Sequence, residues 1–134
     1  MDGAGIAAAL SAGAQAAQLG TAFIACPESS ASAHHRALLA RPGARTALTD
    51  AISGRPARGI VNALLEELGA APHPPVPDYP LAYHAVKALL AAGEDEHYSV
   101  NWAGEGLALS RPMGAAELVR ALAREMAGAA GQPK

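Results

Sequence analysis

A glycine followed by a hydroxyl residue stands near the start of the chain, in a setting that suits an anion. Gly20 and Thr21 come directly before the apolar run of residues 22–26. Glycine lets the backbone approach a phosphate closely, and backbone N–H groups can then point at the phosphate oxygens. The pattern indicates an anion site, although Gly-Thr pairs also end strands in proteins where they bind nothing.

Arginines and histidines later in the chain are the other residues that could bind an anion or a metal. Arg55 and Arg58 flank Pro56 and could clamp an anion through paired hydrogen bonds, but such arginines pair more often with local carboxylates or carbonyls. His34 and His35 are adjacent, so on a helix they point about 100° apart and cannot hold one metal ion together. The sequence therefore favours structural roles for all four and predicts no metal site.

The single cysteine, the single tryptophan and two of the tyrosines are expected in the core. Cys26 has no neighbouring base or cation in the sequence that would activate its thiol, so a buried thiol is expected. Trp102 is expected to anchor packing, and Tyr79 and Tyr83 to belong to a helix stripe that faces the core. A buried amide that neighbouring backbone groups satisfy is one interpretation of Gln18.

Composition limits the class of protein. The 134 residues fit one ordinary domain, and 51% of them are hydrophobic, although many of these are small alanines. The net charge of −2 comes without a basic cluster, so neither a nucleic acid nor an anionic membrane surface is an expected partner. A single cysteine, an acidic start without a basic signal region, and no apolar run of about 20 residues together favour a cytoplasmic protein.

The elements that must position the glycine and threonine are short. A helix over residues 3–12 ends at Gly13, and an apolar strand over 15–20 follows after a brief turn. A helix, a short turn and an apolar strand in this order are typical of architectures that alternate strands and helices. A lone strand of this kind leaves unpaired backbone edges, which favours self-association.

Later elements follow from apolar spacing and from breaker residues. Residues 34–39 are expected to form a helix capped by upstream serines, and 46–52 a short extended segment. Helical spacing predicts two packed helices, one over 60–68 and one that begins at Pro80 and ends at Gly93, with a proline-rich linker between them. A polar loop at 94–96, a helix over 114–127 and a frayed end at 132–134 complete the chain.

These residues in this order resemble the carboxyl-terminal half of the flavin-dependent nitronate monooxygenases, formerly called 2-nitropropane dioxygenases. The resemblance covers essentially the whole chain. It begins with residues 2–10 leading into 13–23 and continues through four later landmarks: Ser53 to Gly59, Tyr79 to Leu81, Trp102 to Gly104 and Ala115 to Val119. Glu105 departs from the pattern, because relatives often carry glutamine there.

The resemblance implies an α/β fold, a partial TIM barrel that contributes the last strand and its flanking helices. Residues 1–28 would be a barrel remnant, 29–110 a mainly helical segment that covers the substrate, and 111–134 the closing helix and tail. A full barrel takes about 250 residues. The family pattern places Gln18, Gly20 and Thr21 beside FMN as half of a phosphate cradle between the last two strand ends.

The implied activity is oxidation of small alkyl nitronates to carbonyl compounds and nitrite with dioxygen, by an FMN enzyme of which this chain is an inactive carboxyl-terminal fragment. The histidine proposed as the catalytic base of relatives would precede Met1, and none of the five histidines here matches it, so no catalytic residue is assigned. Two alternatives stay open. One is a helical interaction module without catalysis, and the other is a different FMN barrel oxidoreductase, such as an enoyl-thioester reductase.

Overall fold

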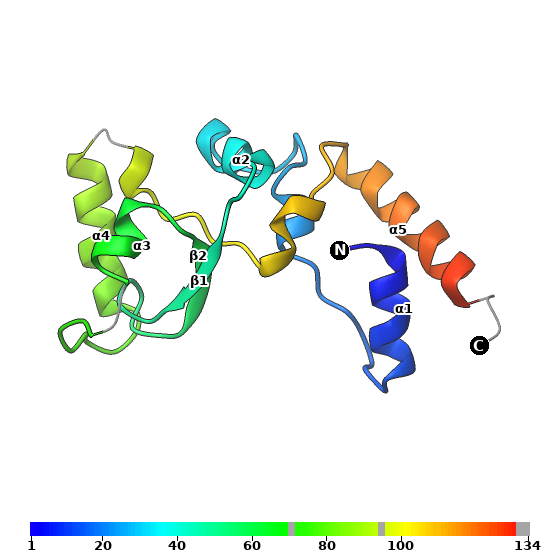
Figure 1. Cartoon of the computed structure of the whole chain (residues 1–134), viewed down its shortest axis with the longest axis horizontal. Coiled ribbons are helices and arrows are strands. Elements are labelled where there is room, and N and C mark those ends of the chain that lie inside the picture. The colour runs from blue at the N-terminus through cyan, green and yellow to red at the C-terminus, as the bar shows by residue number, and fades with distance from the viewer. Residues whose placement is uncertain (70–71, 94–95, 131–134) are drawn as a thin grey trace. The chain divides into compact units, whose positions relative to one another are not determined.

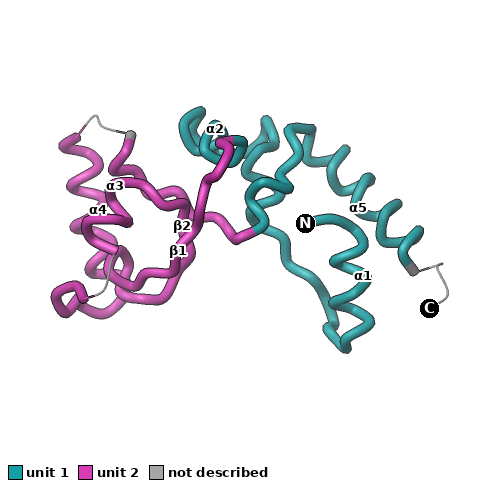
Figure 2. The backbone as a smooth tube through the Cα atoms, in the orientation of Figure 1, with its two compact units in different colours: residues 1–40, 106–134 teal, residues 41–105 magenta. Residues whose placement is uncertain are grey.

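The computed structural model describes residues 1–69, 72–93 and 96–130, and they fall into two compact units (Figure 2). Unit 1 takes in residues 1–40 and the described residues from 106 onward, and unit 2 takes in 41–105. The barrel and cover roles expected for 1–28, 29–110 and 111–134 stay a prediction. The frayed end at 132–134 and most of the polar loop at 94–96 lie outside the described residues.

Unit 1 is built around two packed helices, α1 (Gly3–Ser11) and α5 (Ala115–Ala130), which lie side by side in Figure 1. The Asp2 carboxylate caps α1 by accepting a hydrogen bond from the Gly5 N–H at 2.8 Å. Leu118 and Leu122 on α5 are buried, whereas Val119 on the same helix is exposed. Unit 1 also contains η1 (Thr21–Phe23), α2 (Ala33–Ala40) and η3 (Glu105–Leu109), the last starting at the unit boundary.

The predicted strand over 15–20 does not form. These residues run as an irregular connection from α1 to η1, and only Leu19 among them packs against the core of Ala22, Cys26, Leu118 and Leu122. A strand depends on hydrogen bonds to a neighbouring strand, and the single sheet among the described residues lies in unit 2. Residues 15–20, two of which are glutamines, therefore have no neighbouring strand with which to pair in the part of the chain that the structure describes.

The carboxylate of Glu125 joins three segments of unit 1. It accepts a hydrogen bond from the Gly3 N–H at 2.8 Å and forms an ion pair with Arg111. The hydrogen bond from Arg111, followed by that from Gly3, holds the pKa of Glu125 below its usual range. A charged Glu125 therefore stabilises the link between α5 and the start of α1.

We expect acid to destabilise unit 1 through Glu125. The pKa of Glu125 is lower in the folded chain than in the unfolded chain. Its contribution to folding stability is therefore present above the unfolded pKa of about 4.3, and it is lost as the pH falls through the folded pKa. Between about pH 6 and about pH 3, thermal unfolding should therefore show a smaller loss of stability for Glu125→Gln than for the wild-type chain. Glu117→Gln, an exposed position of the same helix, is the control and should keep the wild-type acid response.

Unit 2 is organised by an antiparallel hairpin of β1 (Thr46–Thr49) and β2 (Ala57–Ile60), with Thr46 opposite Ile60 and Thr49 opposite Ala57. The extended segment predicted at 46–52 therefore ends at Thr49, because the chain turns at 50–56. Trp102 forms an isolated antiparallel bridge with Gly59 on the open side of β2. The hairpin thus places residues 53–59 next to Trp102.

The helix predicted over 60–68 begins later than expected. Ile60 ends β2, and its N–H donates to the Asn101 carbonyl at 2.8 Å, so the strand keeps this residue. Asn62 then caps α3 (Ala63–Glu67) by accepting from the Leu65 N–H at 3.2 Å. The apolar residues from 60 to 65 therefore belong to two elements, with Ile60 buried at the end of β2 and Leu64 and Leu65 buried on α3.

The second predicted helix of unit 2 is confirmed as α4 (Leu81–Ala92), with Gly93 at its end. Leu64 and Leu65 of α3 pack with Val86 of α4 around the fully buried Ile52. Tyr83 and Leu90 border this core, but Tyr79 precedes the helix and is 53% exposed, so its predicted place in the packed stripe is wrong. A further short helix, η2 (Glu96–Tyr98), follows α4, and no helix in the described ranges is both long and apolar enough to cross a membrane.

Candidate functional site

The predicted anion corner lies on the connection between α1 and η1. Gly20 is exposed, and no atom outside its chain neighbours comes within 4 Å of the position where a Cβ would stand. Its carbonyl accepts from the Phe23 N–H at 3.0 Å, and the Thr21 carbonyl accepts from Ile24, which fixes the short turn of η1. Hydrogen bonds therefore fix the backbone of this corner, and the space beside the Gly20 Cα is empty.

Gln18 lines a hollow of about 180 Å³ beside this corner, and it is exposed instead of forming the buried amide that was one interpretation. The other lining residues are Met1, Asp2, Gly5, Ile6, Ala17 and Leu19, and neither Gly20 nor Thr21 is among them. Asp2 brings a carboxylate to the hollow, which disfavours an anion there. The structure thus separates Gln18, which faces the hollow, from the exposed Gly20 and the half-buried Thr21.

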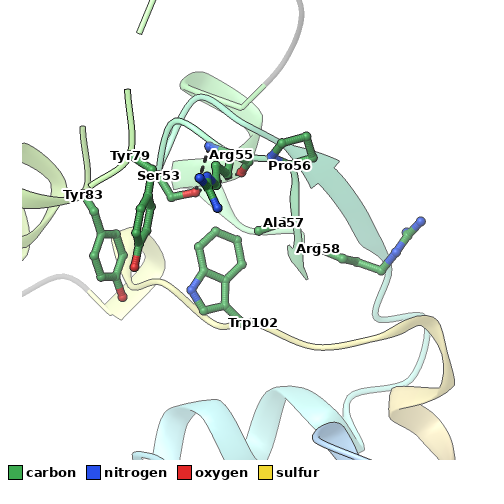
Figure 3. A pocket seen from close by; sticks show the side chains of 8 residues that line it. All are labelled: Ser53, Arg55, Pro56, Ala57, Arg58, Tyr79, Tyr83 and Trp102. Atoms are coloured by element: carbon green, nitrogen blue, oxygen red, sulfur yellow. Dashed lines mark hydrogen bonds between the residues drawn. The ribbon is translucent and has the colours of Figure 1, made fainter. Parts of the chain in front are cut away.

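A larger pocket of about 470 Å³ lies in unit 2 (Figure 3). The turn after β1 and the start of β2 form one wall, the residues leading into α4 form another, and Trp102 lies between them. All of its lining residues except Tyr83 belong to three of the landmarks that carry the family resemblance: Ser53, Arg55, Pro56, Ala57, Arg58, Tyr79 and Trp102. These landmarks lie far apart in the sequence, and only the fold brings them together.

Backbone contacts hold the indole of Trp102 in place. The Ala103 N–H donates to the Arg58 carbonyl at 3.1 Å, and the bridge to Gly59 continues this pairing. The buried side chain of Asn101 donates to the Ser99 hydroxyl at 2.7 Å, which orders the approach to the tryptophan. Trp102 is therefore a packing anchor, as predicted, and at the same time a pocket wall.

A histidine and a carboxylate fasten the linker that leads to Tyr79. His73 Nε2 lies 2.7 Å from Asp50 Oδ1, and Nδ1 lies 2.9 Å from the Pro74 carbonyl oxygen. Both neighbours are acceptors, so the doubly protonated ring satisfies both contacts. The hydrogen bond to Pro74, followed by that to Asp50, raises the pKa of His73.

Stability should consequently fall as the pH rises past neutrality. The charged form of His73 is favoured in the folded chain. Its contribution to folding stability is therefore fully present below the unfolded pKa of about 6.5, and it is lost as the pH rises through the raised folded pKa. The difference in melting temperature between about pH 6 and about pH 8.5 should shrink in His73→Gln. His84→Gln, which alters an exposed histidine of α4, should retain the wild-type difference, and an unchanged difference in both variants would argue against the contact.

The structure bears out the expectation that Cys26 is buried. Burial, followed by the charge of Glu28, raises the pKa of its thiol, so a reactive thiolate is disfavoured. No group of three or more histidine, cysteine, aspartate or glutamate side chains among the described residues is arranged to hold a metal ion. The pocket near Trp102 and the corner at Gly20 are thus two candidate sites that offer polar groups to a ligand.

Comparison with known proteins gives one consistent family. The nitronate monooxygenase family model matches residues 1–125. Nitronate monooxygenases of Pseudomonas aeruginosa and Paraburkholderia phytofirmans are 52% and 54% identical over 96% and 94% of this chain. A crystal structure of nitroalkane oxidase from Streptomyces ansochromogenes superposes with a TM-score of 0.82 at 44% identity and covers 97% of this chain.

The described elements define an α/β chain of five α-helices and one two-stranded sheet. This chain belongs to the nitronate monooxygenase family, a family of enzymes. It spans 38% of the length of the P. aeruginosa protein and 36% of that of the P. phytofirmans protein. The family expectation from the sequence is therefore confirmed, and the shared region is a part of those relatives.

Proposed function

We propose that this chain supplies the carboxyl-terminal part of an FMN-dependent nitronate monooxygenase. The observation that carries the proposal is the match over residues 1–125 together with the 52% identity to a nitronate monooxygenase. The names of the relatives favour this function over an enoyl-thioester reductase and over a helical interaction module. In this proposal the two units belong to a TIM barrel and its substrate cover, in a cytoplasmic enzyme.

The corner at residues 18–21 is the proposed contact for the flavin phosphate. It offers the backbone of Gly20, where the space for a side chain is empty, and the Thr21 hydroxyl, while the Gln18 amide faces the neighbouring hollow. Residues 3–27 contain no carboxylate, which suits a dianion. Since Asp2 lines the hollow beside Gln18, the phosphate is assigned to the side of Gly20 and Thr21.

The pocket of unit 2 is the proposed substrate side. A bound flavin would supply the oxidation chemistry with dioxygen, and this chain would orient the nitronate and exclude water. Tyr79 and Tyr83 offer phenol donors, Arg55 offers a cation, and Trp102 offers an apolar wall. We assign no proton transfer to any of these residues.

A chimera tests the proposal. This chain would replace the aligned segment of the P. aeruginosa nitronate monooxygenase, to which it is 52% identical. We expect a yellow protein that absorbs near 450 nm, consumes dioxygen with an alkyl nitronate and releases nitrite. A chimera that elutes as a folded protein but retains no flavin and oxidises no nitronate would contradict the proposal.

A further inference from the structure

The two arginines of the turn and strand at residues 53–59 have different surroundings. Arg58 Nη2 lies 3.0 Å from Glu105 Oε1, and its Nη1 donates to the Thr46 hydroxyl at 3.1 Å. The Arg58 guanidinium points away from Trp102 in Figure 3. Its charge is therefore paired within the protein, which is the structural role that the sequence favours for such an arginine.

Arg55 is held differently. Ser53 Oγ donates to the Arg55 carbonyl at 2.9 Å and accepts from the Arg55 N–H at 3.3 Å, which fixes the backbone at this point of the turn. The guanidinium carbon lies 5.4 Å from the centre of the Tyr79 ring, and no carboxylate of the described residues is within ion-pair distance of it. Stacking on a ring uses the face of the guanidinium and leaves the N–H groups at its edge for a ligand.

The shape and lining of the pocket restrict what that edge can bind. A guanidinium presents parallel N–H donors that match a planar group with two oxygens. Pro56, Ala57 and the Trp102 indole add apolar surface close to this cation. A ligand that fits both features is a small organic anion with a flat, two-oxygen head and a short apolar tail, which is the chemistry of a nitronate and of a carboxylate.

We propose that Arg55 is the residue that selects anionic substrates in this pocket, and that Glu105 keeps Arg58 out of that role. The inference deepens the proposed function, because it rests on the pocket being the substrate side of that enzyme. Arg55 binds the two-oxygen head, and Tyr79 supports the guanidinium from its ring face. Glu105, where relatives often carry glutamine, acts as a positioning residue through Arg58.

The test uses the 134-residue chain itself and requires no flavin. Trp102 is the only tryptophan and lines the pocket, so its indole N–H gives one NMR signal that reports on ligand binding. Propyl-2-nitronate, propionate and neutral 2-nitropropane would be titrated into the wild-type chain and into Arg55→Gln and Arg58→Gln. Arg45→Gln, which removes an exposed arginine near Glu66, controls for the loss of one surface charge.

We expect a saturable shift of the indole signal with both anions and none with 2-nitropropane. Arg55→Gln should weaken anion binding about tenfold, the effect of one lost charge-assisted interaction, because the exposed side chain is not part of the core. Arg58→Gln and Arg45→Gln should stay within about twofold of the wild-type affinity. Because Arg58→Gln loses the contacts with Glu105 and Thr46, thermal unfolding of both controls accompanies the titration.

Equal affinity in Arg55→Gln and the wild-type chain, equal losses in Arg55→Gln and Arg45→Gln, or no saturable shift in the wild-type chain would overturn the inference. Its failure is distinguishable from failure of the proposed function. If the chimera binds no flavin and is inactive but anion binding depends on Arg55, the proposed oxidation is wrong and the anion site stands. If the chimera is active but Arg55→Gln has no effect on anion binding, the proposed function stands and the role of Arg55 is wrong.

Discussion

Replacing Gly54 with alanine is expected to destabilise unit 2 by about 2 to 5 kcal/mol and to disturb the wall of the large pocket. Gly54 has a φ of 80°, which costs a residue with a Cβ about 1 to 2 kcal/mol. An added Cβ would also stand 2.5 Å from the Pro77 carbonyl oxygen and 2.9 Å from the Tyr79 N. Forcing these backbone atoms apart adds about 1 to 3 kcal/mol.

Gly43→Ala is a matched control for this change. Gly43 has a φ of 74°, but no atom lies within 4 Å of its Cβ position, so only the backbone cost of about 1 to 2 kcal/mol should appear. Urea unfolding of both variants gives the difference that belongs to the contact with the linker. The Trp102 indole signal should move in Gly54→Ala and stay in place in Gly43→Ala. Equal destabilisation would show that the close approach of Gly54 to the linker is wrong.

The second large effect is expected at the contact between α1 and α5. A Cβ on Gly3 would overlap the Met126 N, the Leu122 carbonyl oxygen at 2.5 Å and the Glu125 Cβ. Most of these atoms belong to the α5 backbone and cannot rotate away. We therefore expect Gly3→Ala to cost about 1 to 3 kcal/mol through overpacking, and the shift also endangers the hydrogen bond from Gly3 to Glu125.

Gly128→Ala should act in the opposite direction. Gly128 lies in α5 with nothing within 4 Å of its Cβ position, so alanine should stabilise the helix by about 0.5 to 1 kcal/mol. Comparing the urea midpoints of the two variants tests the packing of α1 on α5 without relying on a single substitution. A Gly3→Ala chain as stable as the wild type would contradict this packing.

Helices with regular apolar spacing and clear end signals were predictable from the sequence. The spacing of Leu118 and Leu122 predicts α5, and the proline before Leu81 together with Gly93 predicts the limits of α4. These signals are local, because each helix forms its backbone hydrogen bonds within itself. The capping residues Asp2 and Asn62 belong to the same local chemistry.

Strands were less predictable, because their hydrogen bonds join distant residues. Ile60 is predicted to begin a helix, yet pairing with β1 and with Asn101 draws it into extended structure. Residues 15–20 are predicted to form a strand, but they include two glutamines and a glycine and form none among the described residues. Sheet formation thus depends on partners that the periodicity of a single segment does not reveal.

In the candidate sites, too, residue chemistry is predictable from the sequence, whereas contacts between distant residues are not. The chemistry of Gly20 and Thr21 can be read from their types, but the orientation of Gln18 toward a hollow shared with Asp2 depends on α1. The structural role favoured for Arg55 and Arg58 fits Arg58, which pairs with Glu105, while Arg55 lies on the Tyr79 ring. Their different roles are set by residues about 20 and about 50 positions away in the chain, which spacing within the motif cannot report.

The central claim is that the corner at Gly20 and Thr21 holds the phosphate of a flavin. The most direct measurement compares the affinities of FMN and riboflavin for the chimera with the P. aeruginosa relative, with and without Thr21→Val. The account predicts that FMN binds more tightly than riboflavin, and that Thr21→Val weakens FMN about tenfold while leaving riboflavin unchanged. Equal affinities for the two flavins, or an equal loss of both in Thr21→Val, would contradict it.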